Sequence, residues 1–297
     1  MFNGHDLNKG YYHICTDGNA IPWMFQDDED FIAGINRIAL CILKNYVEII
    51  AFILMDNHVH FVLYGTAFQC KKFINSYKML TGKWIHNKYG LKDYLRLLPT
   101  EMISISDEET LLNTLAYIDR NSIVAGYRYM PSEYPWGSAR YMFRDKEHEY
   151  QHESDFKPLA QLPLSKQRSL LKTRAKVPGE WYVDSSGMIS PSSFMDFSRI
   201  EQIFRTPTRY SYFLAKKLEG QVEMQLAKSR KVFIPDKELR QIVRKIAHDT
   251  YRTEDVRTLD VNSRLAIARR LRYDYASTLK QISRMVCLTD DLLKGFV

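Results

Sequence analysis

Two histidines, His58 and His60, stand one residue apart in the β-forming run MDNHVHFVLYG at residues 55–65. On a strand, alternate side chains point to the same face, so the two imidazoles share a face with their α-carbons about 7 Å apart. Neutral imidazole is a common metal ligand, and the pair could converge on one cation. The alternative is two half-buried histidines on a partly polar sheet face, because two ligands alone do not make a catalytic metal site.

A third ligand and a nucleophile can be sought in the segment 107–126, which contains LAYIDRN. Tyr117 and Asn121 are four residues apart, so on a helix they are neighbours on one face. Together they could supply both missing groups. The alternative assigns Tyr117 to a core or an interface and Asn121 to a cap near the helix end.

The elements that must position these residues alternate regularly along the first 130 residues. The hydrophobic pattern predicts strands at 11–17, 47–55 and 58–64, and helices at 27–46, 67–90 and 107–126. The two-residue turn Asp56-Asn57 predicts a hairpin, and Pro99 places a fourth strand, within 96–106, at a sheet edge. This order predicts an α+β fold, with a ferredoxin-like βαββαβ unit over 1–145 and an extra helix that carries Tyr117.

The rest of the chain is predicted to be a polar linker at 146–163 and a mainly helical domain at 164–297. Its C-terminus suggests a helix-turn-helix, with a helix at 279–286, a turn at Cys287-Leu288, and Thr289 as the cap of a second helix. Two acids, Asp290 and Asp291, at the start of that second helix argue against simple reading of bases in the major groove.

The net charge of +7 and the pI near 9.0 favour a polyanionic partner. No apolar run approaches the roughly 20 residues of a membrane helix, and the N-terminus lacks the apolar core of a signal peptide. We therefore expect a cytoplasmic protein with no membrane partner. The four cysteines are widely spaced without a CxxC pair, which indicates free thiols and argues against disulfides and structural zinc.

The motif DNHVHFVLYG, followed later by YIDRNSIVAGY, resembles the single-tyrosine HUH transposases, which include the IS-two-hundred-like group and the REP-associated tyrosine transposases. In that family, a strand with two histidines precedes a helix that carries a tyrosine and, four residues later, a polar side chain. The segment EYPWGSARYM at 133–142 also resembles the segment that closes many of these domains. The resemblance covers about residues 8–145.

The resemblance implies that His58, His60 and Asn121 bind a magnesium or manganese ion and that Tyr117 is the nucleophile. The reaction that it implies is cleavage and rejoining of single-stranded or hairpin-associated DNA through a 5′-phosphotyrosyl intermediate. Asp56, just before the strand, is a candidate to help deprotonate the tyrosine, or simply a turn residue.

Asp119 and Ser122 depart from the family pattern, which has His and Pro in many members at these positions. The alternative function is therefore a domesticated DNA-binding regulator of transposase descent without cleavage activity. A replication or conjugation initiator ranks third, because the sequence contains no P-loop motif. Whether the protein acts as a monomer or a homodimer stays open.

Two basic segments are candidate DNA-binding surfaces. The helix 67–90 could follow a phosphate backbone and stack unpaired bases, through Lys71, Lys72, Tyr77, Lys78, Lys83, Trp84 and Lys88. The C-terminal segment loosely resembles the DNA-binding domain of the bacterial replication initiator, and it offers phosphate contacts from Arg264, Arg269, Arg270, Arg272, Lys280 and Arg284. The alternatives are a solvated amphipathic helix and a helical domain that binds a protein partner.

Overall fold

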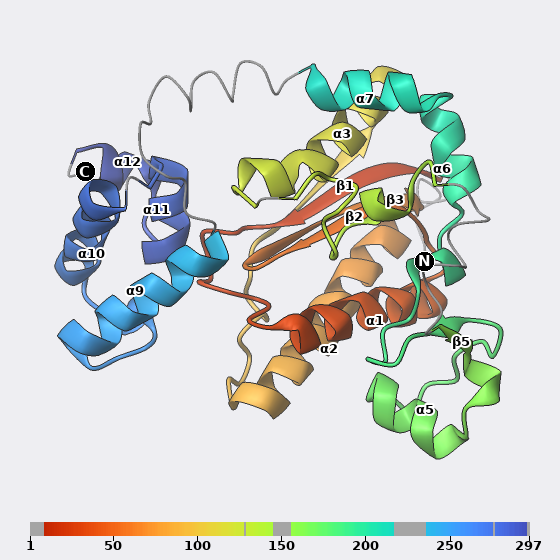
Figure 1. Ribbon diagram of the computed structural model, residues 1–297, viewed down its shortest axis with the longest axis horizontal. Helices are drawn as coiled ribbons and strands as arrows, with labels where there is room; N and C mark the ends of the chain where they lie inside the picture. Colours follow the sequence, from red (N-terminus) through yellow and green to blue (C-terminus); the bar gives the residue numbers. More distant parts are fainter. Residues whose placement is uncertain (1–8, 128, 145–155, 217–235, 276, 296–297) are drawn as a thin grey trace, which may run out of the picture.

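The computed structural model describes residues 9–127, 129–144, 156–216, 236–275 and 277–295. A four-stranded antiparallel sheet with helices on both faces is followed by a mainly helical C-terminal part (Figure 1). The predicted α+β class is confirmed.

The elements around the sheet follow the predicted order. They are β1 (Gly10–Thr16), α1 (Asp28–Asn45), β2 (Glu48–Met55), β3 (His58–Gly65), α2 (Ala67–Tyr89), β4 (Thr100–Ile105) and α3 (Glu108–Val124). The strands lie in the order β2-β3-β1-β4, and each neighbouring pair is antiparallel. β2 and β3 form the predicted hairpin, and β4 lies at an edge directly after Pro99.

Local signals account for the helix ends. The Asp27 side chain caps α1, and the Asp107 side chain caps α3 by accepting from a backbone N–H of the first turn. Thr66 and Gln69 form a capping box at the start of α2. Gly90 ends that helix with a φ of 74°, a left-handed conformation that glycine adopts without strain.

The two faces of the sheet differ in polarity. Phe61 and Leu63 are fully buried on one face, where the Phe61 ring packs against Phe73 and Tyr77 of α2. The opposite face carries His58 and His60, and the His60 ring contacts Tyr117 of α3. Figure 1 shows α3 and α7 above the sheet and α1 and α2 below it. Strand alternation therefore places both histidines on the α3 side of the sheet, where buried apolar residues such as Ile53 and Val62 share their face.

The segment that resembles the family's closing motif covers the outer edge of β2. The Leu54 N–H donates to the Trp136 carbonyl at 2.9 Å, and the Phe52 N–H donates to the Ser138 hydroxyl at 3.0 Å. The Tyr134 hydroxyl donates to the Leu54 carbonyl at 2.8 Å. These bonds satisfy backbone groups that an open edge would leave unpaired.

The remaining elements are mainly helical, in agreement with the predicted character of residues 164–297. They are η1 (Ser138–Tyr141), β5 (Lys157–Pro158), η2 (Leu159–Gln161), α5 (Leu164–Leu171), β6 (Tyr182–Val183), η3 (Pro191–Ser193), α6 (Phe197–Phe204), α7 (Pro207–Ala215), α9 (Asp236–Tyr251), η4 (Val256–Thr258), α10 (Val261–Asp274), α11 (Leu279–Val286) and α12 (Asp290–Lys294). Most of the predicted linker, and residues 217–235 of the predicted helical domain, lie outside the described residues.

Packing divides the predicted helical domain among three hydrophobic clusters, one of which includes Leu171 of α5. Phe204, Tyr210 and Phe213 of α6 and α7 belong to the core around the main sheet. The helices α9, α10, α11 and α12 form a cluster of their own, centred on residues such as Leu239 and Leu271. These four helices gather at one end of the molecule (Figure 1).

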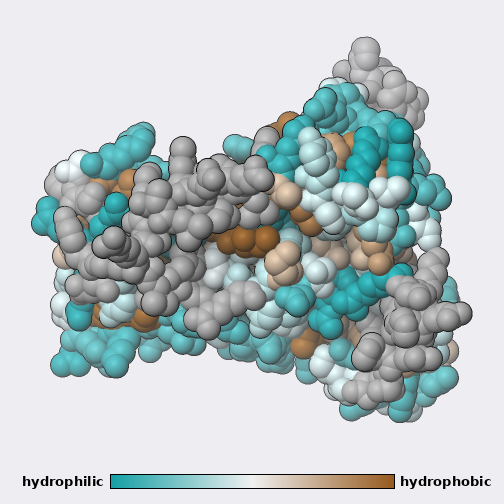
Figure 2. Space-filling model, turned by 45° about the horizontal axis from the view of Figure 1, so that its top comes forward, coloured by the Kyte–Doolittle hydropathy of each residue, from teal (hydrophilic) through white to brown (hydrophobic). Residues whose placement is uncertain are grey.

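The surface shown in Figure 2 is mostly hydrophilic, and its apolar side chains lie in small separate areas. Among the described helices, none combines the length and the apolar character needed to span a membrane.

Candidate active site

The residues of the two sequence motifs meet in one cleft of about 430 Å³, lined by parts of β1, β3, α3 and α11. Its walls include His58, His60, Tyr117 and Asn121. The His58 and His60 ring centroids lie 5.0 Å apart, and the His60 and Tyr117 ring centroids lie 5.7 Å apart. The fold therefore brings together side chains that are far apart in sequence.

Asn57 determines the orientation of the His58 imidazole. Its Nδ2 donates to the Gly18 carbonyl at 2.6 Å, so its Oδ1 faces His58 Nδ1 at 2.7 Å and must accept. His58 therefore carries its proton on Nδ1 and a lone pair on Nε2. Burial, with Arg284 and Arg240 nearby, lowers the pKa of His58 to about 3, so the ring is neutral at neutral pH.

His13, a residue of β1, contacts His60 in a similar way. Its Nε2 lies 3.1 Å from His60 Nδ1, and the two rings are stacked. When His60 donates from Nδ1, its Nε2 is free to bind a cation. Burial lowers the pKa of His13 to about 4 and lowers the pKa of His60 well below its usual value, with His58 adding to the second effect.

Tyr117 projects from α3 with 48% of its side chain exposed. Its ring packs edge-on against His60, and also against His13 at a centroid distance of 6.1 Å. Partial burial raises the pKa of Tyr117, and Cys15 adds to the rise while Arg120 opposes it. The hydroxyl is therefore accessible and protonated at neutral pH.

Asn121 follows Tyr117 by one helical turn. Its Nδ2 donates to the carbonyls of Tyr117 at 2.9 Å and Ile118 at 3.2 Å, which leaves Oδ1 as the free acceptor. The cleft walls thus include two neutral imidazoles and one amide oxygen. This donor set fits a divalent cation with mixed nitrogen and oxygen ligands.

The two departures from the family motif lie on the buried side of α3. The Tyr210 hydroxyl of α7 donates to Asp119 Oδ2 at 2.7 Å, and burial raises the pKa of Asp119 to about 7. Ser122 is fully buried, and its hydroxyl donates to the Asp119 carbonyl at 3.4 Å. Asp119 thus joins α3 to α7, Ser122 bonds within α3, and neither residue is among those that line the cleft.

His13 and Cys15 are site residues that sequence reasoning missed. Cys15 lies directly opposite His60 in the β1–β3 register, and the ligand atoms of His13, Cys15 and His60 all lie within 4.8 Å of one another. Burial raises the pKa of the Cys15 thiol to about 11, with smaller contributions from Glu101 and Asp17. The only signal in the sequence was the alternation of His13 and Cys15 on one face of β1.

The helix α11 contributes positive charge to the cleft through Lys280 and Arg284. The Arg284 guanidinium forms an ion pair with Asp236 at 2.7 Å. Lys280 is exposed, and it has no ion-pair or hydrogen-bond partner among the residues that the structure describes. Lys280 is therefore the cleft cation most available to a phosphate.

Several ion pairs, cation–π contacts and hydrogen bonds attach the C-terminal helices to the sheet unit. Arg240 of α9 pairs with Asp56 at 3.1 Å, and both side chains are buried. The Ser283 hydroxyl of α11 lies 3.3 Å from Asn19 Oδ1. Asp56 is thus held in a buried ion pair and is not among the residues that line the cleft with Tyr117.

The other predicted C-terminal arginines do not line the cleft. Arg264 donates to the Cys287 carbonyl at 3.2 Å, and Arg272 donates to the Ser277 carbonyl at 3.1 Å. Arg269 and Arg270 are exposed on α10.

The predicted DNA-binding residues of α2 belong to a helix that packs on the sheet face opposite to the cleft. Tyr77 is fully buried in the core, which contradicts its predicted exposure to bases. Lys78 donates to the Leu98 carbonyl, while Lys71 and Lys72 are exposed. Trp84 donates to Asp30 at 2.8 Å.

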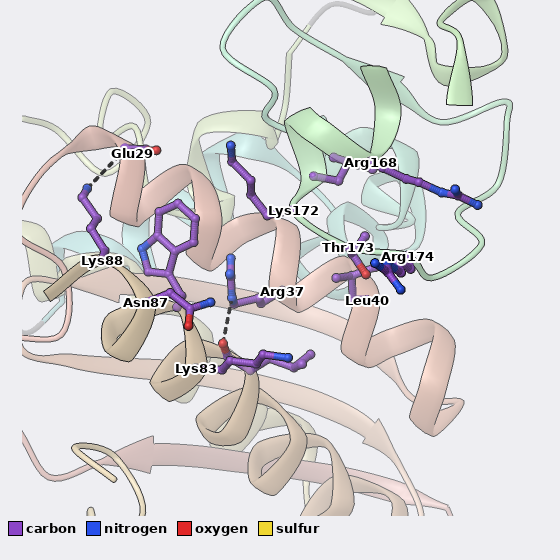
Figure 3. A pocket seen from close by; sticks show the side chains of 13 residues that line it. Glu29, Arg37, Leu40, Lys83, Asn87, Lys88, Arg168, Lys172, Thr173 and Arg174 are labelled. Carbon is purple, nitrogen blue, oxygen red and sulfur yellow. Dashed lines mark hydrogen bonds and ion pairs between the residues drawn. The ribbon is translucent and has the colours of Figure 1, made fainter. Parts of the chain in front are cut away.

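A second pocket, of about 880 Å³, lies on this side between α1, α2 and the end of α5. Figure 3 shows basic side chains around it, with Lys88 paired to Glu29. The lining cations are Arg37, Lys83, Lys88, Arg168, Lys172 and Arg174. The molecule therefore has basic regions on both sides of the sheet.

Comparisons with known proteins give little further information. No family model matches the sequence, and no curated protein matches it. Among solved structures, a REP-associated tyrosine transposase bound to a REP hairpin matches with a TM-score of 0.34 and 11% identity, over 48% of this chain and 83% of that chain. A similarity of this size establishes neither fold nor function, so the function has to be inferred from the site.

Proposed function

We propose that the protein is a metal-dependent tyrosine transposase, or a related nuclease, that cleaves and rejoins single-stranded or hairpin-associated DNA. The observation that supports this most directly is the state of the two imidazoles. Asn57 leaves Nε2 of His58 available beside the half-exposed Tyr117, and Nε2 of His60 is available as well when His60 donates from Nδ1 to His13. A histidine pair with a purely structural role would have no need of this arrangement next to a nucleophile.

In the proposed reaction, Tyr117 Oη attacks a backbone phosphorus while its proton leaves to solvent. The bond between phosphorus and the 3′ oxygen breaks, the 3′ oxygen takes a proton, and a 5′-phosphotyrosyl link holds the DNA. His58, His60 and Asn121 would hold a magnesium or manganese ion, which supplies Lewis-acid stabilisation of the phosphoryl oxygens. Lys280 would bind an adjacent phosphate at the rim.

We further propose that the βαββαβ unit of residues 1–145 has the ferredoxin-like arrangement of this transposase class, since its strand order and antiparallel pairing are compatible with it. The helical segment 164–297 would then serve as an accessory domain. Its α11 brings positive charge to the cleft of the first unit.

The test is formation of a covalent protein–DNA adduct. The full-length protein is incubated with a labelled hairpin oligonucleotide that carries single-stranded flanks, with Mn²⁺ or with EDTA, and the products are separated on a denaturing gel. We expect an adduct only with Mn²⁺, and we expect Tyr117→Phe to abolish it. Tyr212→Phe is a matched control, because Tyr212 is a 58%-exposed tyrosine on α7 away from the cleft.

An adduct that forms equally well with Tyr117→Phe would show that the nucleophile is misassigned. Salt-dependent DNA binding that survives His58→Ala, without an adduct under any divalent metal, would favour the domesticated regulator instead.

A further inference from the structure

A cluster of three ligand side chains joins β1 to β3 beside the proposed catalytic site. His13 and Cys15 alternate on β1 and so share a face, and Cys15 stands opposite His60 across the strand pair. His13 Nε2 is 3.1 Å from His60 Nδ1, and all three ligand atoms lie within 4.8 Å of one another. None of these contacts involves Asn121, the oxygen donor of the catalytic set.

We propose that His13, Cys15 and His60 form a second metal site, selective for a thiophilic divalent cation such as Zn²⁺, that competes with the catalytic cation for His60. Thiolate and imidazole ligands favour Zn²⁺ over Mg²⁺. Two imidazole nitrogens of a tetrahedral zinc site lie roughly 3.3–3.4 Å apart, given Zn–N bonds of about 2.0–2.1 Å. The observed separation is close to this value, so small side-chain shifts would complete the site.

Charge also fits zinc at this position. When the S–Zn bond forms, the Cys15 thiol proton leaves to solvent, which leaves one positive charge on the zinc–thiolate unit with its two neutral imidazoles. Glu101 pairs with Cys15 in the β1–β4 register, and Glu101 and Asp17 also line the cleft. Both carboxylates can offset that charge, and the cleft leaves room for a water as the fourth ligand.

The two sites exclude each other because they use opposite nitrogens of one ring. Zinc between His13 and His60 binds His60 through Nδ1, so the neutral ring must carry its proton on Nε2. A protonated Nε2 cannot bind a second cation. Zinc would therefore inhibit cleavage, because it removes His60 from the catalytic metal site. This inhibition rests on the proposed function, whereas zinc binding itself does not.

The binding test uses Co²⁺ as a spectroscopic probe for zinc. The full-length protein is treated with EDTA under reducing conditions, desalted and titrated with Co²⁺, and the near-ultraviolet thiolate-to-cobalt charge-transfer band is recorded. We expect the wild type to show this band and to lose it when equimolar Zn²⁺ displaces Co²⁺. The band should remain in excess Mg²⁺. Cys15→Ser should abolish the band. Two control variants should retain it: Cys287→Ser, which alters another partly buried free thiol, and Asn121→Ala.

Circular dichroism establishes that each variant is folded. If Cys15→Ser fails to fold, His13→Gln provides the second test, because it keeps all four thiols and should weaken or remove the band. A wild-type protein without the band, or a band that persists unchanged in folded Cys15→Ser or His13→Gln, would overturn the zinc site.

The inhibition test adds stoichiometric Zn²⁺ to the Mn²⁺-dependent adduct assay. We expect loss of adduct in the wild type and resistance in Cys15→Ser. Equal inhibition of both proteins would overturn the competition for His60. If the wild type forms no adduct under any condition, the proposed function fails, while the cobalt band still decides whether the zinc site exists.

Discussion

At the scale of single residues, the chemistry of the cleft depends on which nitrogen of each imidazole carries the proton. Asn57 imposes this choice on His58, because the Gly18 carbonyl already binds its amide nitrogen. His13 provides the corresponding contact for His60. Both are positioning residues, since each acts through a neighbouring imidazole.

The first prediction concerns Asn57. Asn57→Ala removes the acceptor that holds His58 in its metal-binding tautomer, so we expect Mn²⁺ affinity to fall by about 10–100-fold. Electron paramagnetic resonance of free Mn²⁺ in a titration of the full-length protein measures this directly. Asn113→Ala is the control, because Asn113 is a residue of α3 whose Nδ2 makes an exposed hydrogen bond to the Glu109 carbonyl of the same helix. Unchanged Mn²⁺ affinity in Asn57→Ala would contradict the role of this residue.

The sequence permitted prediction of the site residues whose relation is local. The spacing of His58 and His60, and that of Tyr117 and Asn121, is set by a single strand and a single helix. His13 and Cys15 reach the site only through the register between β1 and β3. Register depends on the burial of whole strands and on the connections between them, so no short-range pattern could indicate it.

At the scale of elements, α3 has two faces with different roles. Tyr117 and Asn121 face the cleft, whereas Asp119 and Arg120 hold α7 against the other side. The Arg120 guanidinium donates to the Phe213 carbonyl at 2.9 Å. The position of the nucleophile therefore depends on buried polar contacts between α3 and α7.

The second prediction follows from the raised pKa of Asp119. Its pKa rises from 3.8 to about 7 on folding, so the folded state favours the protonated acid, and stability is lost as pH rises from about 4 to about 7. Asp119→Asn stays neutral and can still accept from Tyr210. We expect Asp119→Asn to have a higher free energy of unfolding than the wild type. This difference should be roughly 2 kcal/mol larger at about pH 8 than at about pH 5.

Urea denaturation at the two pH values measures that gain. Asp291→Asn, at a fully solvated position of α12, should show no comparable dependence on pH. An equal gain at both pH values would mean that Asp119 is ionised in the folded protein across this range.

Element positions were largely predictable because they depend on local signals such as caps, turns and hydrophobic periodicity. It was harder to predict which elements pack against one another. The apolar faces of α6 and α7 are typical of any amphipathic helix, and nothing in their pattern indicates that they pack on the first unit rather than on α9 to α12. Such a choice depends on the shape of the complete surface.

At the scale of the whole molecule, basic side chains lie on both sides of the sheet. Lys280 is in the cleft with Tyr117, whereas Lys83 lies in the pocket between α1, α2 and the end of α5. A short single strand bound at Tyr117 cannot contact both sides at once, because the sheet and its helices separate them (Figure 1). The two candidate DNA-binding surfaces can therefore be tested separately.

The third prediction uses salt dependence to distinguish the two surfaces. Each lost phosphate contact reduces the slope of log K against log salt concentration by about 0.7 for single-stranded DNA. For a short single-stranded oligonucleotide measured by fluorescence anisotropy, we expect Lys280→Ala to reduce the slope by about this amount and Lys83→Ala to leave it unchanged. The reverse result would place the strand on the α2 side, remote from Tyr117, and would separate DNA binding from the proposed chemistry.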